Sequence, residues 1–184
     1  MLSMKKIVYL FAAVLLFASC AKEEIGGTAT EALAGQWYVH VDAVDESGEL
    51  VYSDDELFGI GNFMLLTYNT AANTADELFV DDLESFWNFK VKVGCSTSDK
   101  TFGNSDYVDN FKYESGVKLF DGKILKGAAT TPSGMPADSI VFFVEFDDDL
   151  TEVDDDVFEY TPDAYGFAKY RVSGFRYTGF KNDD

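Results

Sequence analysis

The sequence predicts an all-β domain, folded as an antiparallel barrel or strongly curved sandwich of about eight strands. The first observation behind this prediction is periodicity: from residue 36 onward, apolar side chains recur at every second position, as in half-buried strands. The second is spacing, because the apolar runs follow one another at intervals of roughly 8 to 15 residues. With 47% hydrophobic and 16% aromatic residues, the chain is also far too apolar to stay disordered.

The first half of the domain begins with a predicted strand over residues 37–43. A polar turn at 45–48 leads into a short run at 49–52, and this combination is typical of a hairpin. A second strand covers residues 63–69 and ends at the polar turn 70–74.

The clearest alternation lies in residues 86–95. The odd-numbered residues from 87 to 93 are apolar and their neighbours are polar or charged, so we expect one buried and one wet face. Helical signal is thin, and we expect at most a single helical turn, at residues 81–85.

The pair Asp121-Gly122 lies between apolar runs at 113–120 and 123–127. Because this pair suits the positive φ angles of a tight turn, we predict a hairpin there. The last two predicted strands cover residues 139–147 and 168–180. The first of these is nearly all apolar, so we expect it to be covered on both faces of the sheet.

The N-terminus is typical of an export signal. Lys5 and Lys6 precede an apolar run of about eleven residues, which is too short to span a bilayer. The ending Ala18-Ser19-Cys20 resembles a bacterial lipoprotein signal, which implies that the Cys20 sulfur carries lipid. The alternative is an ordinary signal with an incidental thiol.

Three segments follow from this interpretation. We predict a lipoprotein signal peptide over residues 1–19, a lipidated tether over 20–32 and a single barrel domain over 33–184. The start of the tether, residues 21–24, resembles the Lys-plus-acidic signal that sends Bacteroidetes lipoproteins to the outer face of the outer membrane. The alternative for this segment is a solvated charged linker.

Charge and cysteine content exclude several classes of protein. The net charge of −19 argues against nucleic acid or an anionic membrane surface as a partner, so we expect membrane contact through the anchor alone. If Cys20 carries lipid, Cys95 has no disulfide partner within the chain and is expected to be a small buried hydrophobe. No phosphate-binding, zinc or dinucleotide motif is present, so we expect no cofactor.

Two short segments carry a family resemblance. Residues 33–38, reading LAGQWY, resemble the Gly-x-Trp segment that opens the first strand of lipocalins. The resemblance implies a lipocalin-like (calycin-like) barrel closed by Gly35, Trp37 and Arg176, with the arginine packed across the indole. Residues 170–179, reading YRVSGFRYTG, resemble the end of a Bacteroidetes family of lipocalin-like lipoproteins described as lipid-binding hydrolases. That description implies an activity but supplies no catalytic motif to transfer.

Catalytic and metal-binding candidates are few. His40 is the single histidine, and the nucleophile motif Gly-x-Ser-x-Gly is absent. Glu145 follows apolar residues on one strand face, where a carboxyl group could act as an acid or bind a polar head group. Clustered carboxylates could bind calcium, although a solvated acidic loop is the favoured explanation. The candidate metal ligands are Asp147, Asp149, Asp154 and Asp156.

Aromatic residues point to a binding protein. A closed barrel of about eight strands can hold one small apolar ligand, although the same side chains could instead fill a solid core. The predicted ligand-binding residues are Trp37, Phe63, Trp87, Phe89, Phe142, Phe175 and Tyr177. We therefore expect a monomeric, outer-membrane-anchored protein that binds a small hydrophobic or amphipathic molecule. The alternatives are a hydrolase of a lipid-like ester and a surface adhesin or accessory subunit with a protein partner.

Overall fold

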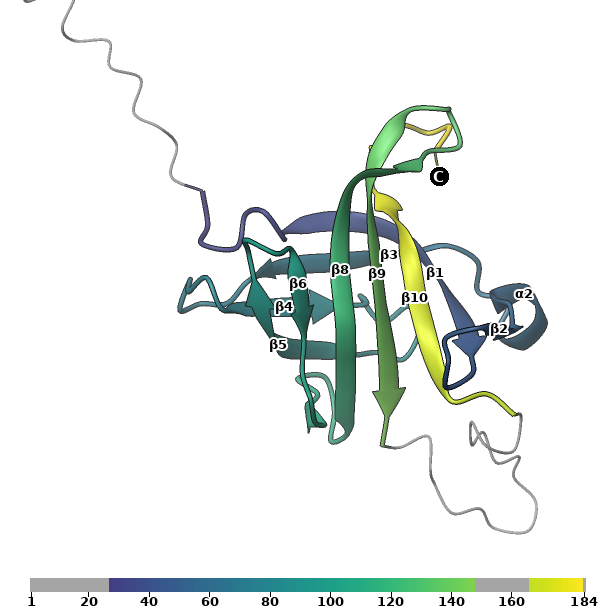
Figure 1. Cartoon of the computed structure of the whole chain (residues 1–184), viewed down its shortest axis with the longest axis horizontal. Helices are drawn as coiled ribbons and strands as arrows, with labels where there is room; N and C mark the ends of the chain where they lie inside the picture. The colour runs from purple at the N-terminus through teal and green to yellow at the C-terminus, as the bar shows by residue number, and fades with distance from the viewer. Residues whose placement is uncertain (1–26, 148–165, 184) are drawn as a thin grey trace, which may run out of the picture.

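The computed structural model describes residues 27–147 and 166–183 (Figure 1). Eight strands form a closed antiparallel barrel in the order β10-β9-β8-β6-β5-β4-β3-β1, and β10 pairs with β1 to close it. Two short strands, β2 and β7, pair with β1 and β8 respectively. The predicted all-β barrel is therefore confirmed. The strands are β1 (Gly35–Val44), β2 (Leu50–Tyr52), β3 (Phe63–Asn69), β4 (Glu77–Asp81), β5 (Lys90–Ser96), β6 (Thr101–Gly103), β7 (Val108–Asp109), β8 (Gly116–Thr130), β9 (Pro136–Phe146) and β10 (Lys169–Arg176).

The seam between β1 and β10 runs over eight residue pairs, from Trp37 opposite Arg176 to Val44 opposite Lys169. Along β1, the apolar residues from Trp37 to Ala43 point inward and are fully buried, while the residues between them face out. The interior that these strands enclose is a continuous apolar core.

The barrel has two ends that we name by their contents. The plug end holds Trp37, and there β1 begins and β10 ends. At the opposite end β9 finishes, β10 begins and the chain passes from β4 to β5; we call it the aromatic end. Helix α2 (Asp54–Leu57) also lies at the aromatic end (Figure 1). Across residues 27–147 and 166–183, no helix has the length and apolarity needed to cross a bilayer.

Two predictions about local structure were wrong, and one strand was missed. Residues 86–89 form a loop rather than the start of a strand, because the buried carboxylate of Asp82 binds their backbone amides. The helical turn lies at α2 and not at residues 81–85. Strand β4 was not predicted at all, since its five residues are too few to show a period.

The predicted hairpin at Asp121-Gly122 is instead a bulge inside the continuous strand β8. Asp121 does adopt a positive φ of 52°, but the chain continues in the same direction. A Cβ at Gly122 would lie 2.6 Å from the Phe102 ring, so glycine is needed for close packing against β6. The true hairpin joins β8 to β9 several residues later.

We predict that Gly174→Val opens the β1–β10 seam. Gly174 lies opposite Val39, and an added Cβ would overlap the Tyr38 carbonyl oxygen and lie 2.6 Å from the Val39 Cα. Because the obstacle is backbone, we expect the free energy of unfolding in urea to fall by about 3 kcal/mol. The matched control is Ser173→Ala on the same strand, for which a loss below about 1 kcal/mol is expected. Equal stability of the two variants would contradict the argument.

Candidate functional site

The plug end of the barrel is filled by a tryptophan and an arginine. The Arg176 guanidinium carbon lies 4.3 Å from the centroid of the Trp37 ring. The indole Nε1 donates to Thr67 Oγ1 at 2.8 Å, and that hydroxyl donates to the Leu33 carbonyl at 2.6 Å. A Cβ at Gly35 would overlap the guanidinium, so the plug has no room for a larger residue there.

Arg176 makes further polar contacts at this end. It donates to the Ala34 carbonyl at 3.0 Å and lies 3.4 Å from the Asp138 carboxylate. The indole Nε1 and the guanidinium Nη1 and Nε groups each have a protein partner at the plug. An incoming ligand at this end would have to break a connected set of hydrogen bonds.

The opposite end contains eight aromatic side chains in mutual contact. Phe86 is the hub, with five ring neighbours at centroid distances from 5.1 to 6.4 Å. Trp87 stacks nearly parallel on Phe146 at 4.8 Å and 14°. We call this set the aromatic cluster. Its members are Phe58, Phe63, Phe86, Trp87, Phe89, Phe146, Phe167 and Tyr170.

The members of the aromatic cluster differ in how they are held. Phe63, Phe146 and Tyr170 lie on strands and are buried. Three others, Phe58, Phe86 and Trp87, lie outside the strands and are only partly buried. We call these three the loop aromatics. They cover the strand-borne rings from the solvent side without themselves belonging to the barrel wall.

A buried carboxylate fixes the loop that carries two of the loop aromatics. Asp82 is fully buried and accepts four backbone hydrogen bonds of 2.9 to 3.1 Å, from the amides of Glu84, Phe86, Trp87 and Phe89. Such a charge-assisted set is strong because each donor already points at the anion. The loop backbone is therefore rigid although it lies between strands.

A second side chain ties this loop to the next one. Asn110 donates to the Asn88 carbonyl at 3.3 Å and accepts from the Lys90 amide at 3.0 Å. Its amide also donates to the Ser115 hydroxyl at 3.2 Å. The segment between β7 and β8 is thus held beside the aromatic cluster.

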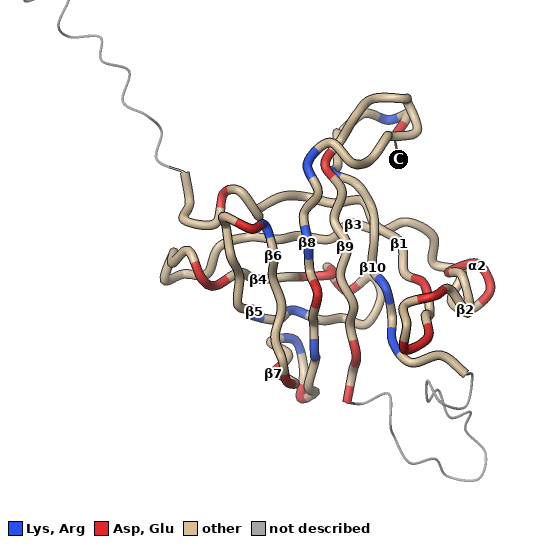
Figure 2. The backbone as a smooth tube through the Cα atoms, in the orientation of Figure 1, with Lys and Arg blue, Asp and Glu red and all other residues tan. Residues whose placement is uncertain are grey.

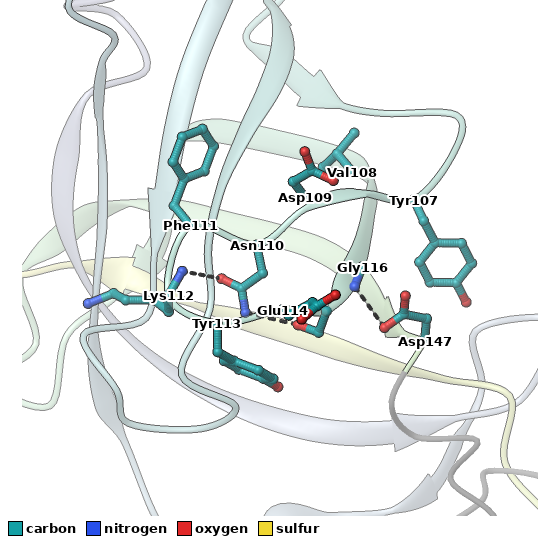
Figure 3. A pocket seen from close by; sticks show the side chains of 11 residues that line it. Tyr107, Val108, Asp109, Asn110, Phe111, Lys112, Tyr113, Glu114, Gly116 and Asp147 are labelled. Atoms are coloured by element: carbon teal, nitrogen blue, oxygen red, sulfur yellow. Dashed lines mark hydrogen bonds between the residues drawn. The ribbon is translucent and has the colours of Figure 1, made fainter.

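That segment forms a pocket of about 610 Å³, lined by residues 107–116 and Asp147 (Figure 3). Three carboxylates line it: Asp109, Glu114 and Asp147. Lys112 also lines it, but its ammonium group lies 3.5 Å from Glu84 and 3.9 Å from Asp81, outside the pocket lining. The pocket at the aromatic end is therefore acidic.

The structure places the seven predicted ligand-binding residues in different regions. Phe63, Trp87 and Phe89 lie together in the aromatic cluster, whereas Trp37 lies at the plug end. Phe142 is buried between them and contacts Phe102.

Two of those seven residues do not face the interior. Phe175 and Tyr177 pack against Tyr38 at centroid distances of 5.9 and 6.4 Å, on the outer face of the β1–β10 seam. The reason is strand parity, since Arg176 points inward and its two neighbours must point outward.

Sequence reasoning missed five members of the aromatic cluster. Two of them could have been found by strand alternation, because they share a face with predicted inward residues. The other three lie in loops, where no period exists to assign a side chain to the interior. The missed residues are Phe58, Phe86, Phe146, Phe167 and Tyr170.

The two catalytic candidates lie on the outer face of the barrel. His40 Nε2 lies 3.3 Å from the Ser173 hydroxyl and 3.5 Å from the Asp42 carboxylate. A serine-histidine-aspartate relay needs both ring nitrogens, one for each partner, and here both partners meet the same nitrogen. Glu145 is paired with Lys118 at 3.0 Å. Neither candidate faces the barrel interior.

Of the candidate metal ligands and the two cysteines, the structure describes only some. Asp147 accepts the Gly116 amide at 2.7 Å, while Asp149, Asp154, Asp156 and Cys20 lie outside the described residues. The part of the chain that the structure describes contains no group of three side chains suited to a metal ion. Burial, assisted by nearby carboxylates, raises the pKa of the Cys95 thiol, which lowers its thiolate fraction and its reactivity.

Comparison with known proteins adds one match. A family model described as lipid-binding putative hydrolase matches residues 22–181. The match spans both barrel ends and agrees with the family that the two resembling segments indicated, so that prediction is confirmed. None of the curated proteins compared with the chain matches it.

We predict that Asp82→Ala destabilises the fold and releases Trp87. Four buried amides would lose their acceptor, so the free energy of unfolding should fall by about 3 kcal/mol. Trp87 emission should move to longer wavelength as its ring leaves the stack on Phe146. The matched control is Asp55→Ala, which removes the same charge from an exposed site in α2. If both variants unfold at the same urea concentration, Asp82 does not hold the loop.

Proposed function

Because the chain belongs to the lipid-binding putative hydrolase family, we propose that it binds one hydrophobic, lipid-like molecule inside the barrel at the aromatic end. The observation that carries this proposal is the division of the aromatic cluster into strand-borne rings and loop aromatics. The strand-borne rings form a fixed apolar floor, and the loop aromatics cover it. An acyl chain can take their place because it offers the same kind of contact.

The chemistry of the two ends favours the aromatic end. At the plug end, entry would separate Arg176 from the Ala34 carbonyl and expose buried polar groups. At the aromatic end, entry exchanges one apolar contact for another. Each methylene group that the ligand buries contributes about 0.8 kcal/mol, so a long acyl chain can offset the exposure of two or three half-buried rings.

The proposal is one of binding. His40 and Glu145 take no part in it, because both lie outside the barrel wall and are engaged with other side chains. The barrel then acts as a container whose occupant is defined by shape and polarity.

We also propose that the protein is a lipoprotein held at the surface of the outer membrane through Cys20. The lipoprotein-like signal and the charged residues after it support this proposal. The described chain starts beside the plug end, where the Ala29 amide donates to Asn73 at 2.9 Å (Figure 1). A tether from that side would leave the aromatic end directed away from the anchor.

The two tryptophans give a test of the ligand's position. A monoacylglycerol brominated on its acyl chain should quench Trp87 in a saturable titration, because bromine quenches only rings that it contacts. The variant Trp87→Phe should lose most of this quenching, since the chain's other tryptophan is Trp37 at the plug end. Native mass spectrometry should show one added lipid per chain in both proteins.

The matched control for this test is Phe175→Ala, which removes an aromatic ring from the outer face. It should bind and be quenched as the unchanged chain is. Absence of saturable binding would contradict the proposed function, and quenching that survives in Trp87→Phe would place the ligand elsewhere.

The anchor has a separate test. Cys20→Ser in the full chain should move the protein from the membrane fraction to the soluble fraction, because no acyl group could then be attached. Cys95→Ser changes the other cysteine and should remain in the membrane fraction. Membrane association that persists in Cys20→Ser, at the level of Cys95→Ser, would refute the lipid anchor.

A further inference from the structure

We propose that the barrel selects lipids with an uncharged head group and rejects anionic ones such as free fatty acids. This inference rests on the proposed function, because it concerns the ligand of the same aromatic end. It follows from where the charged side chains of the described chain lie and which of them are already paired.

The barrel interior offers no cation to an anionic head group. The buried charged side chains of the described residues are all aspartates, and none is lysine or arginine. Arg176 packs on the buried Trp37 ring, and it is committed to the plug by its contacts with Trp37, Ala34 and Asp138. A carboxylate drawn into this interior would lose its hydration without gaining a partner.

The lysines at the aromatic end are committed as well. Lys112 lies against Asp81 and Glu84, and Lys118 pairs with Glu145. Two further lysines of the described residues, Lys90 and Lys169, lie over aromatic rings of the outer face, at 4.9 Å from the Phe79 centroid and 5.0 Å from the Phe143 centroid respectively. A fatty-acid carboxylate at this end would have to compete with protein carboxylates for Lys112 and Lys118, or reach Lys90 and Lys169 on the outer face.

Carboxylates dominate the same end. Asp109 and Glu114 line the pocket of Figure 3 and are exposed, and their carboxylates make no hydrogen bond or ion pair within the described residues. Figure 2 shows further acidic positions at α2 and at the end of β9. Because these charges share a rim with the aromatic cluster, their field raises the free energy of an anionic head group held there. An uncharged hydroxyl or ester meets no such repulsion.

Competition between ligands with the same twelve-carbon chain tests this selectivity. Lauryl alcohol and laurate would each displace the uncharged probe N-phenyl-1-naphthylamine from the full chain, at pH 8 and low salt. We expect lauryl alcohol to bind at least about tenfold more tightly than laurate, which corresponds to about 1.4 kcal/mol. Added salt should reduce the difference in affinity between lauryl alcohol and laurate, because salt screens the rim charges.

Charge reversal at the rim tests the cause. The double variant Asp109→Lys/Glu114→Lys should bind laurate several-fold more tightly and leave lauryl alcohol unchanged. The matched control Glu31→Lys/Asp76→Lys makes the same change of charge at exposed positions of the plug end and should keep the original preference.

The outcomes separate this inference from the proposed function. Laurate binding as tightly as lauryl alcohol would overturn the inference while leaving lipid binding intact. If both double variants still prefer lauryl alcohol over laurate to the same extent, the rim carboxylates are not the cause of the selectivity. If neither the probe nor either ligand binds, the proposed function fails and the selectivity fails with it.

Discussion

The closure of the barrel by the β1–β10 seam is the constraint on which the other features depend. The seam joins the first and last strands of the barrel, so the interior exists only when nearly the whole chain has folded. Its eight residue pairs determine the parity of β1 and β10, that is, which of their side chains point into the barrel and which point out. That parity sends Trp37 and Arg176 inward to form the plug and sends Phe175 outward. Gly174 allows the two backbones to approach in the half of the seam nearer the plug end.

Closure produces two ends with different physical chemistry. At the plug end, the side chains are joined by directional contacts, from the indole to Thr67 and from the guanidinium to Ala34. At the aromatic end, the contacts are between rings and have little directional requirement. A network of directional hydrogen bonds loses much of its stabilising free energy when one member moves. Contacts between rings can instead be exchanged for other apolar contacts. This difference, more than any cavity, gives the barrel one fixed end and one end suited to exchange.

The sequence was sufficient to predict the features that follow from strand periodicity. It predicted the barrel and strand β3 to the residue, because alternation encodes them locally. The pairing of Trp37 with Arg176 was implied by the resemblance to lipocalins. It failed where a side chain overrides the local pattern. Asp82 turns an alternating segment into a loop, and Phe102 packing turns a hairpin signal at Gly122 into a bulge. Both effects depend on residues brought together by folding, so no local pattern could reveal them. Phe58 and Phe86 were missed for the same reason.

The buried Asp82 carboxylate also limits how a ligand could enter. It fixes the amides on both sides of the loop tip, at Glu84 and at Phe89. A large backbone displacement would therefore leave a buried charge without its hydrogen-bond donors. Rotation of the Phe86 and Trp87 side chains leaves those hydrogen bonds intact, because only backbone amides take part in them. Entry by side-chain rotation therefore exposes ring area, which an acyl chain covers again on binding. A rigid loop backbone with displaceable rings thus lets the aromatic end open without loss of the barrel.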